Sequence, residues 1–279
     1  MDFCYEKNDV WTITNLGAIL FARSLNRFSS LSGREVVVRK YEGMNNRQLQ
    51  FEQRGGLGYA VGFEGLIDFI MRNTGNEVID VARNINPIYP RVAIREFVAN
   101  ALIHQDFAID GSPITIEIFS NRLVITNPGA PLNNISRLLD LPPRSRNERL
   151  AQAMLLLNIC ERRGSGVDRA IEAVEKMFLP PVKFQSMDDY TRVSLFPQKP
   201  VAEMTKSEKI MACYQHACLM WEDNKTINNQ SIRERFSLNK NQAPTATRIL
   251  ADTVEAGFIK SSDEEFVSRK YSSYVPFYA

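Results

Sequence analysis

The chain has 279 residues, of which 44% are hydrophobic and 24% charged, and its formal net charge is +2. This composition excludes a disordered chain, and the near-neutral charge gives no overall electrostatic reason to bind nucleic acid, so any such surface has to be local. The apolar runs are far too short to span a bilayer, and Met1 is not followed by a basic and then apolar leader. We therefore expect a cytoplasmic protein of two domains with no membrane partner.

Sequence motifs for structural zinc and for nucleotide-driven motors are missing. The cysteines and histidines are few and form no C-x-x-C pair: Cys4, Cys160, Cys213, Cys218, His104 and His216. Structural zinc needs ligands clustered at short spacings, so we expect reduced and mostly buried thiols instead. No G-x-x-x-x-G-K-[ST] sequence occurs, which argues against a helicase or another Walker-type motor.

The first third of the chain mixes helix and strand. Its hydrophobic spacing predicts, in order, a helix over 15–25, a strand over 35–41, a strand over 49–51 and an amphipathic helix over 59–72. Gly56-Leu57-Gly58, with Gly62, is only superficially similar to a dinucleotide-binding loop, because no strand is expected to lead into it.

A helix predicted over 92–107, just after Pro90, carries a polar stripe on an otherwise apolar cylinder. Glu96, Asn100 and His104 are spaced four residues apart, so their side chains drift by only ~40° per step and lie on one narrow face. Buried carboxylates and amides cost several kcal/mol unless they are satisfied. We therefore expect protein partners, ordered water or a ligand to face this stripe.

The chain then changes from helical to alternating periodicity. The pattern predicts a hairpin with strands over 113–119 and 123–126, a short helix over 134–140, a helix over 147–158, a glycine turn at 163–166, a helix over 167–177 and a strand over 191–196. Helices that feed a largely antiparallel sheet, without strict βαβ alternation, define an α+β fold.

Residues 204–279 follow a linker at 198–203 and have a different pattern. Helices are predicted over 204–223, 229–236 and 242–256, with Gly257 as the last C-cap, and strands over 258–260 and 271–277. Three helices followed by a β-ribbon are typical of a winged helix-turn-helix domain.

The third of these helices would be the recognition helix. Its predicted apolar stripe is Ala246, Ile249, Leu250 and Val254, and the polar residues left facing outward are Asn241, Gln242, Thr245 and Arg248. Such residues can contact base edges in the major groove, and phosphates could be met by Arg269 and Lys270 between the wing strands and by Arg233 and Arg235 on the preceding helix. The acidic run 263–265 keeps open the alternative of a winged helix that contacts protein or dimerises.

Three elements in chain order suggest one phosphate- and metal-binding site. They are the helix with Glu96 and Asn100, the strand that runs into Asn127-Pro128-Gly129, and the turn Arg163-Gly164-Ser165-Gly166 that opens a helix. A glycine turn at a helix N-terminus offers free N–H groups and the positive dipole end to a phosphate. A glutamate and an asparagine one turn apart suit an activated water and a hydrated magnesium ion.

These motifs also carry a resemblance to a known family. REFVANALIHQDF, ITIEIFSNRLVITNPGAPL and SRNERLAQAMLLLNICERRGSGVDRAIEAV resemble the C-terminal ATP-binding region of the RecG-helicase-related or AlbA-type transcriptional regulators. That region is a divergent member of the GHKL superfamily, similar to gyrase B, histidine kinases and MutL. The likeness covers residues 92–197, and 14–28 resembles the family's connector. It implies a GHKL (Bergerat-like) α/β sandwich that binds ATP and Mg2+.

Carried over residue by residue, the resemblance makes Glu96 the general base and Asn100 the magnesium ligand. The cofactor-binding residues would be Asn100, Asn127, Gly129, Arg146, Gly164, Ser165 and Gly166, with the last three around the phosphates.

The adenine-reading box of the family, D-x-G-x-G, departs from its pattern here. It reads Asn127-Pro128-Gly129-Ala130-Pro131, so that Asn127 replaces the aspartate and Pro131 the last glycine. An aspartate accepts from the adenine amino group without ambiguity, whereas an asparagine must orient its carbonyl to do so. We therefore expect nucleotide binding with weakened adenine specificity and doubtful hydrolysis.

Each candidate also has a structural interpretation. Glu96 would pair with Arg91 or Arg95 on a solvated face, Asn100 would cap or bridge core groups, and His104, for which we favour this interpretation, would be a scaffold residue. Gly164 and Gly166 would only permit a tight turn. Ser145-Arg146-Asn147 is primarily a helix cap, although Arg146 or Arg163 could reach a phosphate bidentately.

The sequence thus predicts a connector at 1–53, which in the family follows an AlbA-like domain, a GHKL-like nucleotide-binding domain at 54–199 and a winged helix at 204–279. The expected function is an ATP-binding transcriptional regulator, not a true helicase, whose nucleotide state controls the winged helix. Its partners would be double-stranded DNA and a nucleotide, with a homodimer as a further option. The alternatives are a slow magnesium-dependent ATPase and an interaction module with a degenerate nucleotide pocket.

Overall fold

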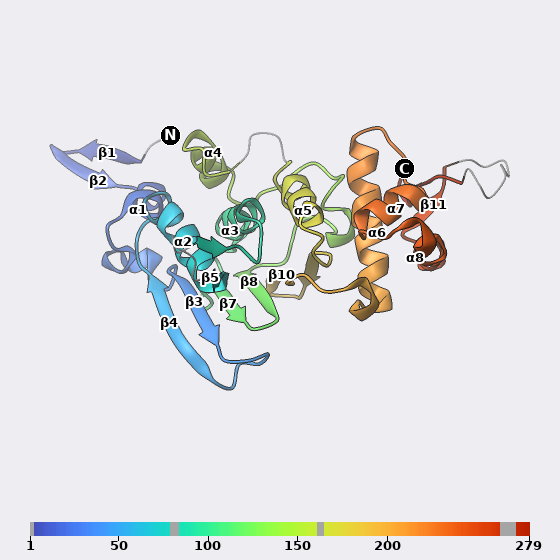
Figure 1. Ribbon diagram of the computed structural model, residues 1–279. Coiled ribbons are helices and arrows are strands. Elements are labelled where there is room, and N and C mark those ends of the chain that lie inside the picture. Colours follow the sequence, from blue (N-terminus) through green and yellow to red (C-terminus); the bar gives the residue numbers. More distant parts are fainter. Residues whose placement is uncertain (1–2, 79–83, 161–164, 263–271) are drawn as a thin grey trace. The chain divides into compact units, whose positions relative to one another are not determined.

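The computed structural model describes residues 3–78, 84–160, 165–262 and 272–279 (Figure 1). Its contacts divide the chain into two compact units, which are unit 1, Met1–Ala170 with Lys183–Leu195, and unit 2, Ile171–Val182 with Phe196–Ala279. The division into 1–53, 54–199 and 204–279 remains a prediction of domain boundaries.

Unit 1 is built on a six-stranded sheet with the strand order β4-β3-β7-β8-β10-β9. In chain order, its strands are β3 (Val36–Tyr41), β4 (Leu49–Gly55), β7 (Ile114–Phe119), β8 (Arg122–Pro128), β9 (Lys183–Ser186) and β10 (Tyr190–Leu195). Within this sheet β3 and β7 pair in parallel, and every other pair of neighbours is antiparallel. The predicted α+β class with a largely antiparallel sheet is confirmed.

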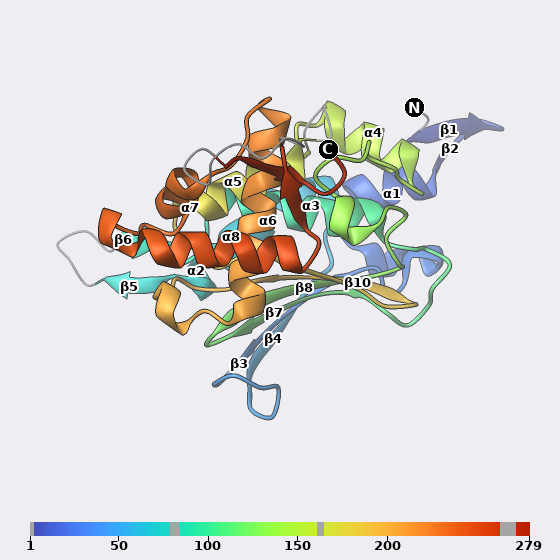
Figure 2. The ribbon, with the colours of Figure 1, turned by 90° about the vertical axis from the view of Figure 1, so that its right-hand side faces the viewer.

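Helices of unit 1 cover one face of this sheet (Figure 2). They are α1 (Asn15–Phe21), α2 (Tyr59–Thr74), α3 (Arg91–His104) and α4 (Glu148–Leu156), and α5 (Gly166–Lys176) begins in the same unit. Strand β7 buries Ile114, Ile116 and Ile118, while its alternate residues are half-buried, because successive side chains point to opposite faces. Phe97 and Leu102 of α3 complete this core.

Helix α1 is shorter than predicted, because the chain after it bonds to a distant segment. The Gly58 N–H donates to the Ala22 carbonyl at 2.7 Å, and the Leu25 N–H donates to the Gly56 carbonyl at 2.8 Å. A Cβ on Gly58 would lie 2.6 Å from the Leu20 carbonyl carbon, so glycine permits this approach. Contrary to expectation, a strand does lead into these glycines, since β4 extends to Gly55. Their close packing on α1 explains them without a dinucleotide.

Other differences concern short elements. The helix expected over 134–140 is only a 3-10 turn, Ile135–Arg137. Five short strands were not predicted: β1 (Cys4–Lys7), β2 (Val10–Ile13), β5 (Asn76–Val78), β6 (Asn84–Asn86) and β9. Strands of three or four residues give too few positions for an alternating pattern to stand out.

Unit 2 contains three helices followed by an antiparallel ribbon, as predicted. The helices are α6 (Lys206–Glu222), α7 (Asn229–Arg235) and α8 (Ala243–Glu255), and the ribbon strands are β11 (Ile259–Ser261) and β12 (Tyr274–Pro276). Thr205 and Glu208 form a capping box that starts α6. Gly257 has a φ of 75° just after α8, which is the conformation expected of a C-terminal cap.

A buried ionic cluster lies inside unit 2. The His216 Nδ1 atom is 3.0 Å from Glu175 Oε2 and bonds to it, and Arg235 Nη2 donates to the Leu179 carbonyl at 2.9 Å. Arg235 Nε lies 3.1 Å from Glu175 Oε1, in an ion pair that lacks the alignment of a hydrogen bond. This placement overturns the expectation that Arg235 meets DNA phosphates, because its side chain is buried against the core of its own unit.

None of the helices among the described residues combines the length and the hydrophobicity that a membrane-spanning segment needs.

Candidate functional site

Unit 1 contains a partly open cavity of about 660 Å3, a size within the range of small-molecule sites. It lies against α3, β8, β9, β10, the loop 131–146, α4 and the first turn of α5. The predicted site residues that line it are Glu96, Asn100, Asn127, Arg146 and Gly166. The structure therefore brings the three sequence elements together in one place.

Helix α3 supplies the polar wall of the cavity. Glu96 is only 4% exposed, and Asn100 and His104 are half-buried on the same wall. Arg91 and Arg95 pair with Glu64 and Asp68 rather than with Glu96. The Asn100 amide forms no hydrogen bond to another described residue, so it neither caps nor bridges the core.

Glycine at the start of α5 allows the Glu96 carboxylate to approach closely. A Cβ on Gly166 would lie 2.5 Å from Glu96 Oε2, too near for any other residue without a shift. Arg169, one turn further along α5, brings its Nη1 atom to 4.0 Å from Glu96 Oε1. A carboxylate at a helix N-terminus is also favoured by the helix dipole. Glycine is thus required at position 166 by the close approach of the Glu96 carboxylate, and not only by the tight turn.

Asn127 presents a defined hydrogen-bonding group. Its Nδ2 atom donates to the Pro128 carbonyl at 3.1 Å, and the residue is 6% exposed. Because the amino group is engaged, the Oδ1 atom remains as an acceptor on this side chain. An acceptor is what the aspartate of the resembled family would offer at this position.

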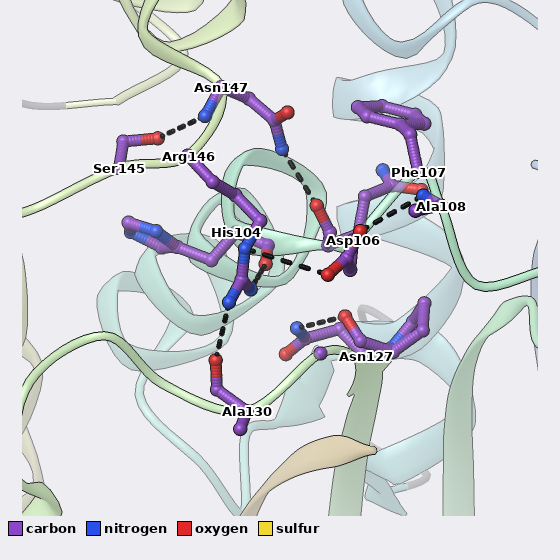
Figure 3. Close-up of polar contacts among 12 residues, drawn as sticks. His104, Asp106, Phe107, Ala108, Asn127, Ala130, Ser145, Arg146 and Asn147 are labelled. Atoms are coloured by element: carbon purple, nitrogen blue, oxygen red, sulfur yellow. Dashed lines mark hydrogen bonds and ion pairs between the residues drawn. The ribbon is translucent and has the colours of Figure 1, made fainter. Parts of the chain in front are cut away.

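Arg146 ties the loop over the cavity to the end of α3 (Figure 3). Its Nη1 atom donates to the His104 carbonyl at 3.0 Å, and its Nη2 atom donates to the Ala130 carbonyl at 2.9 Å. Gly129 has a φ of 101°, and a Cβ there would lie 2.6 Å from Arg146 Nη1. Gly129 therefore makes room for the guanidinium and does not itself line the cavity.

Asn147 has a different capping role from the one predicted. Its Nδ2 atom donates to the carbonyls of Ile103 and Gln105, both at 2.7 Å, and its side chain makes no cap bond to α4 (Figure 3). These carbonyls belong to the C-terminal end of α3, where they have no partner within the helix. Asn147 therefore caps the C-terminus of α3 rather than the N-terminus of α4.

The surroundings of His104 disfavour its charged form. Burial lowers the pKa of its imidazole, and the nearby Arg146 guanidinium lowers it further. The imidazole lines the cavity, as Arg146 does.

The remaining predicted residues divide into two groups. Ser165 lies just before α5 and does not line the cavity. Gly164 and Arg163 fall outside the described residues, so their roles around a phosphate stay predictions.

Sequence reasoning missed the apolar side of the cavity. Its lining side chains come from the loop over it, from α4 and from β9: Leu132, Leu138, Leu141, Ala151, Leu155 and Phe184. Only the helical spacing of Ala151 and Leu155 could have indicated a shared face. Arg144 also lines the cavity, and no ion pair joins it to another described residue.

The predicted DNA-contacting residues lie in unit 2. Asn241 and Gln242 end a 3-10 turn before α8, Thr245 and Arg248 lie in α8, and all are exposed. Gln242 is partly engaged, since its Oε1 atom accepts from the Asn239 N–H at 3.0 Å. Arg269 and Lys270 lie outside the described residues.

One member of the predicted apolar stripe of α8 is wrong. Val254 is 40% exposed, and Thr253 is buried in its place. The Thr253 hydroxyl donates to the Ile249 carbonyl at 2.7 Å, which satisfies its polar group inside the core.

Comparison with known families gives a match for part of unit 1. Residues 111–195 match the family HATPase_c_4, described as "Putative ATP-dependent DNA helicase recG C-terminal". Asn127, Gly129 and Arg146 fall inside this stretch, and α3 lies just before it. The match supports a RecG-related, ATPase-like region, and the mixed sheet is consistent with a GHKL-like α/β fold.

A solved structure shares the fold. The DIP2311 protein from Corynebacterium diphtheriae aligns with 97% of this chain at a TM-score of 0.58 and 16% sequence identity. This chain spans 47% of that solved chain, about half its length. No curated protein matches the chain in sequence.

Proposed function

We propose that the cavity of unit 1 binds an adenine nucleotide with magnesium, and that the chain is a nucleotide-responsive DNA-binding transcriptional regulator rather than a true helicase. The observation that carries the proposal is the convergence of Glu96, Asn100 and Asn127 on one cavity. The family match in the same unit supports it, since that family's region is ATPase-like.

Asn100 is the proposed magnesium ligand. Mg2+ in nucleotide sites takes only one or two protein ligands and completes its shell with phosphate oxygens and water. The Asn100 amide fits this role because no described side chain or backbone group occupies it. Glu96, four residues before it on the same wall, would orient a water molecule near the metal.

For the triphosphate, Arg144 is a better candidate than Arg146. The two terminal nitrogens of Arg146 already donate to backbone carbonyls, whereas Arg144 lines the cavity and has no described ion pair. A free guanidinium can bind a phosphate bidentately. Arg146 would instead hold the loop that carries Arg144.

Adenine would be read by Asn127. Its Nδ2 atom is bonded to Pro128, which leaves the Oδ1 atom to accept from the exocyclic amino group of the base. The apolar residues of the loop 131–146 and of α4 would cover the base and ribose.

DNA would bind to unit 2, which we propose is a winged helix-turn-helix. Its three helices, its ribbon, and the exposed polar residues before and along α8 support this function. Nucleotide occupancy would order the loop 131–146 and thereby bias the DNA-binding unit, which requires different nucleotide affinities in two states.

The nucleotide proposal is tested by thermal shift of the full chain with ATP and magnesium. We expect a rise in Tm for the wild type and none for Asn100→Ala, whose own Tm without ligand should match the wild type. No shift with any adenine nucleotide would sink the proposal and favour an interaction module with a degenerate pocket.

A slow magnesium-dependent ATPase is the second candidate, favoured by the buried Glu96 beside the cavity. Turnover lost in Glu96→Ala but not in Glu64→Ala, a control carboxylate whose side chain is 62% exposed on α2, would support it. Rates at background for the wild type would exclude it.

DNA binding is tested on the full chain with a fluorescent duplex. We expect affinity that falls with salt, because phosphate contacts release counterions, and that weakens in Arg248→Ala, because this residue would contact base edges. Affinity that ignores both salt and this substitution would contradict the assignment to α8.

A further inference from the structure

The β1–β2 hairpin is a separate two-stranded sheet in unit 1. Its turn residues Asn8 and Asp9 have φ values of 52° and 59°, so the strands are joined by a two-residue turn of the kind that matches strand twist. In Figures 1 and 2 the hairpin projects from α1, away from the six-stranded sheet. It is a preformed arm.

The base of the arm is fixed to α1. The Thr14 N–H and hydroxyl donate to the Phe3 carbonyl at 3.0 and 3.1 Å, and the Phe3 and Phe21 rings meet edge to face. A Cβ on Gly17 would lie 2.1 Å from the same carbonyl oxygen, so this glycine permits the contact. The direction of the arm is therefore set by the fold.

The outer strand of the arm is apolar and uncovered. Val10, Trp11 and Ile13 of β2 are 63%, 65% and 56% exposed. A lone hairpin is marginally stable at best, and soluble proteins usually protect a free strand edge with charge. β1 carries Glu6 and Lys7, but β2 has no charged residue, and its outer edge pairs with no described strand. The unprotected edge is the one suited to pairing.

Backbone geometry decides which groups this edge offers. The Thr14 N–H donates to the Phe3 carbonyl. Continuing from this pair, the hydrogen-bonded pairs of the β1–β2 ladder are Tyr5 with Thr12 and Lys7 with Val10. In an antiparallel pair every second residue bonds across the ladder. The N–H and C=O groups of Trp11 and Ile13 therefore point outward from β2.

We propose that β2 pairs with β2 of a second copy of this chain, about a two-fold axis through Thr12. Antiparallel pairing then places Trp11 opposite Ile13 of the second copy, twice, and Thr12 opposite Thr12. Aromatic–β-branched and Thr–Thr pairs are among the favourable cross-strand pairs. A symmetric interface needs such self-complementarity, and no like charges oppose one another in it.

The resulting four-stranded sheet also places the charged residues of β1 at its outer edges. Glu6 and Lys7 lie on the two outermost strands, where they protect the new edges. A strand edge of this length buries less than the roughly 800 Å2 per partner of a standard stable interface. The dimer is therefore concentration-dependent.

Sedimentation of the full chain over a range of concentrations tests the interface. The wild type should pass from monomer to dimer, Thr12→Arg should weaken dimerisation at least tenfold, and an equimolar mixture of Thr12→Arg and Thr12→Glu should restore it. Val61→Arg, which charges a 54% exposed residue of α2, should leave it unchanged. A wild type that stays monomeric, or equal loss in Val61→Arg, would overturn the proposal.

Disulfide trapping tests the register independently of affinity. In a Cys4→Ser background, Thr12→Cys should form a covalent dimer on oxidation, because non-bonded antiparallel pairs bring Cα atoms to about 4.5 Å. Val10→Cys is the matched control and should cross-link at least tenfold less. Equal cross-linking of the two variants, with their Tm values unchanged, would also overturn the proposal.

Discussion

Glu96 in unit 1 and Glu175 in unit 2 are both largely removed from solvent, with side chains 6% and 11% exposed, and their surroundings differ. In unit 2, Glu175 contacts His216 and Arg235, so its charge is met by side chains of the same core. In unit 1, Glu96 lies on the wall of a cavity, with the half-exposed Arg169 at 4.0 Å and the unengaged Asn100 amide on the same helix. The first arrangement lies inside the core of its unit, whereas in the second Glu96 and Asn100 line a space that a ligand can fill. Buried charges that contact one another within a core indicate a structural role, whereas polar groups around a cavity are typical of a binding site.

The largest effect is expected from breaking the cluster in unit 2. Arg235→Ala leaves Glu175 buried without its cation, which costs about 3–5 kcal/mol of stability. Urea denaturation measures this loss. Lys225→Ala, which removes an exposed ion pair with Asp223, is the control and should cost below about 1 kcal/mol. Equal costs would mean that the cluster is not structural.

The next effect concerns the approach of Glu96 to α5. Gly166→Ala forces a Cβ against the Glu96 carboxylate and should lower stability by about 1–3 kcal/mol, along with loss of the ATP-induced Tm shift. Gly65→Ala in α2 has open space around its Cβ and should be neutral or stabilising by about 0.5–1 kcal/mol. Retained nucleotide binding in Gly166→Ala would separate α5 from the cavity's function.

The two arginines of the loop should separate binding from stability. Arg144→Ala should weaken ATP binding at least tenfold at unchanged Tm, since a lost charged hydrogen bond is worth about 1.5–3 kcal/mol. Arg146→Ala should lower the Tm, because it leaves the His104 and Ala130 carbonyls without a partner. Titration calorimetry and thermal melts distinguish them. If Arg146→Ala instead weakened ATP binding and Arg144→Ala lowered the Tm, Arg146 would be the residue that binds the phosphates.

The smallest effect is the pH dependence of His104. Its pKa is lowered in the folded state, so the folded chain binds fewer protons than the unfolded chain below the ordinary value of 6.5. Stability from this group is full above about pH 6.5 and falls as the pH drops below it. Urea midpoints at pH 7.5 and 5.5 should differ less in His104→Gln than in the wild type. If the two midpoints differed as much in His104→Gln as in the wild type, another group would cause the pH dependence.

Much of the candidate site was predictable from local pattern. The spacing of Glu96 and Asn100 on one helix face follows from helical geometry alone, and both residues line the cavity. The roles of Arg146 and Asn147 could not be read from sequence, because their partners are backbone carbonyls between 16 and 44 positions away along the chain. Such contacts leave no periodic signal.

What the sequence determined by itself is the α+β class, the long helices and the order of elements in the C-terminal unit. Hydrophobic periodicity and capping residues act over one or two turns, so they can be recognised in the sequence. Tertiary structure alone decided that α1 ends at Phe21, that Arg235 is buried and that the Asn127 amino group donates to the Pro128 carbonyl. Each of these depends on which groups meet once the chain is folded, and a buried polar group takes whichever partner the packing provides.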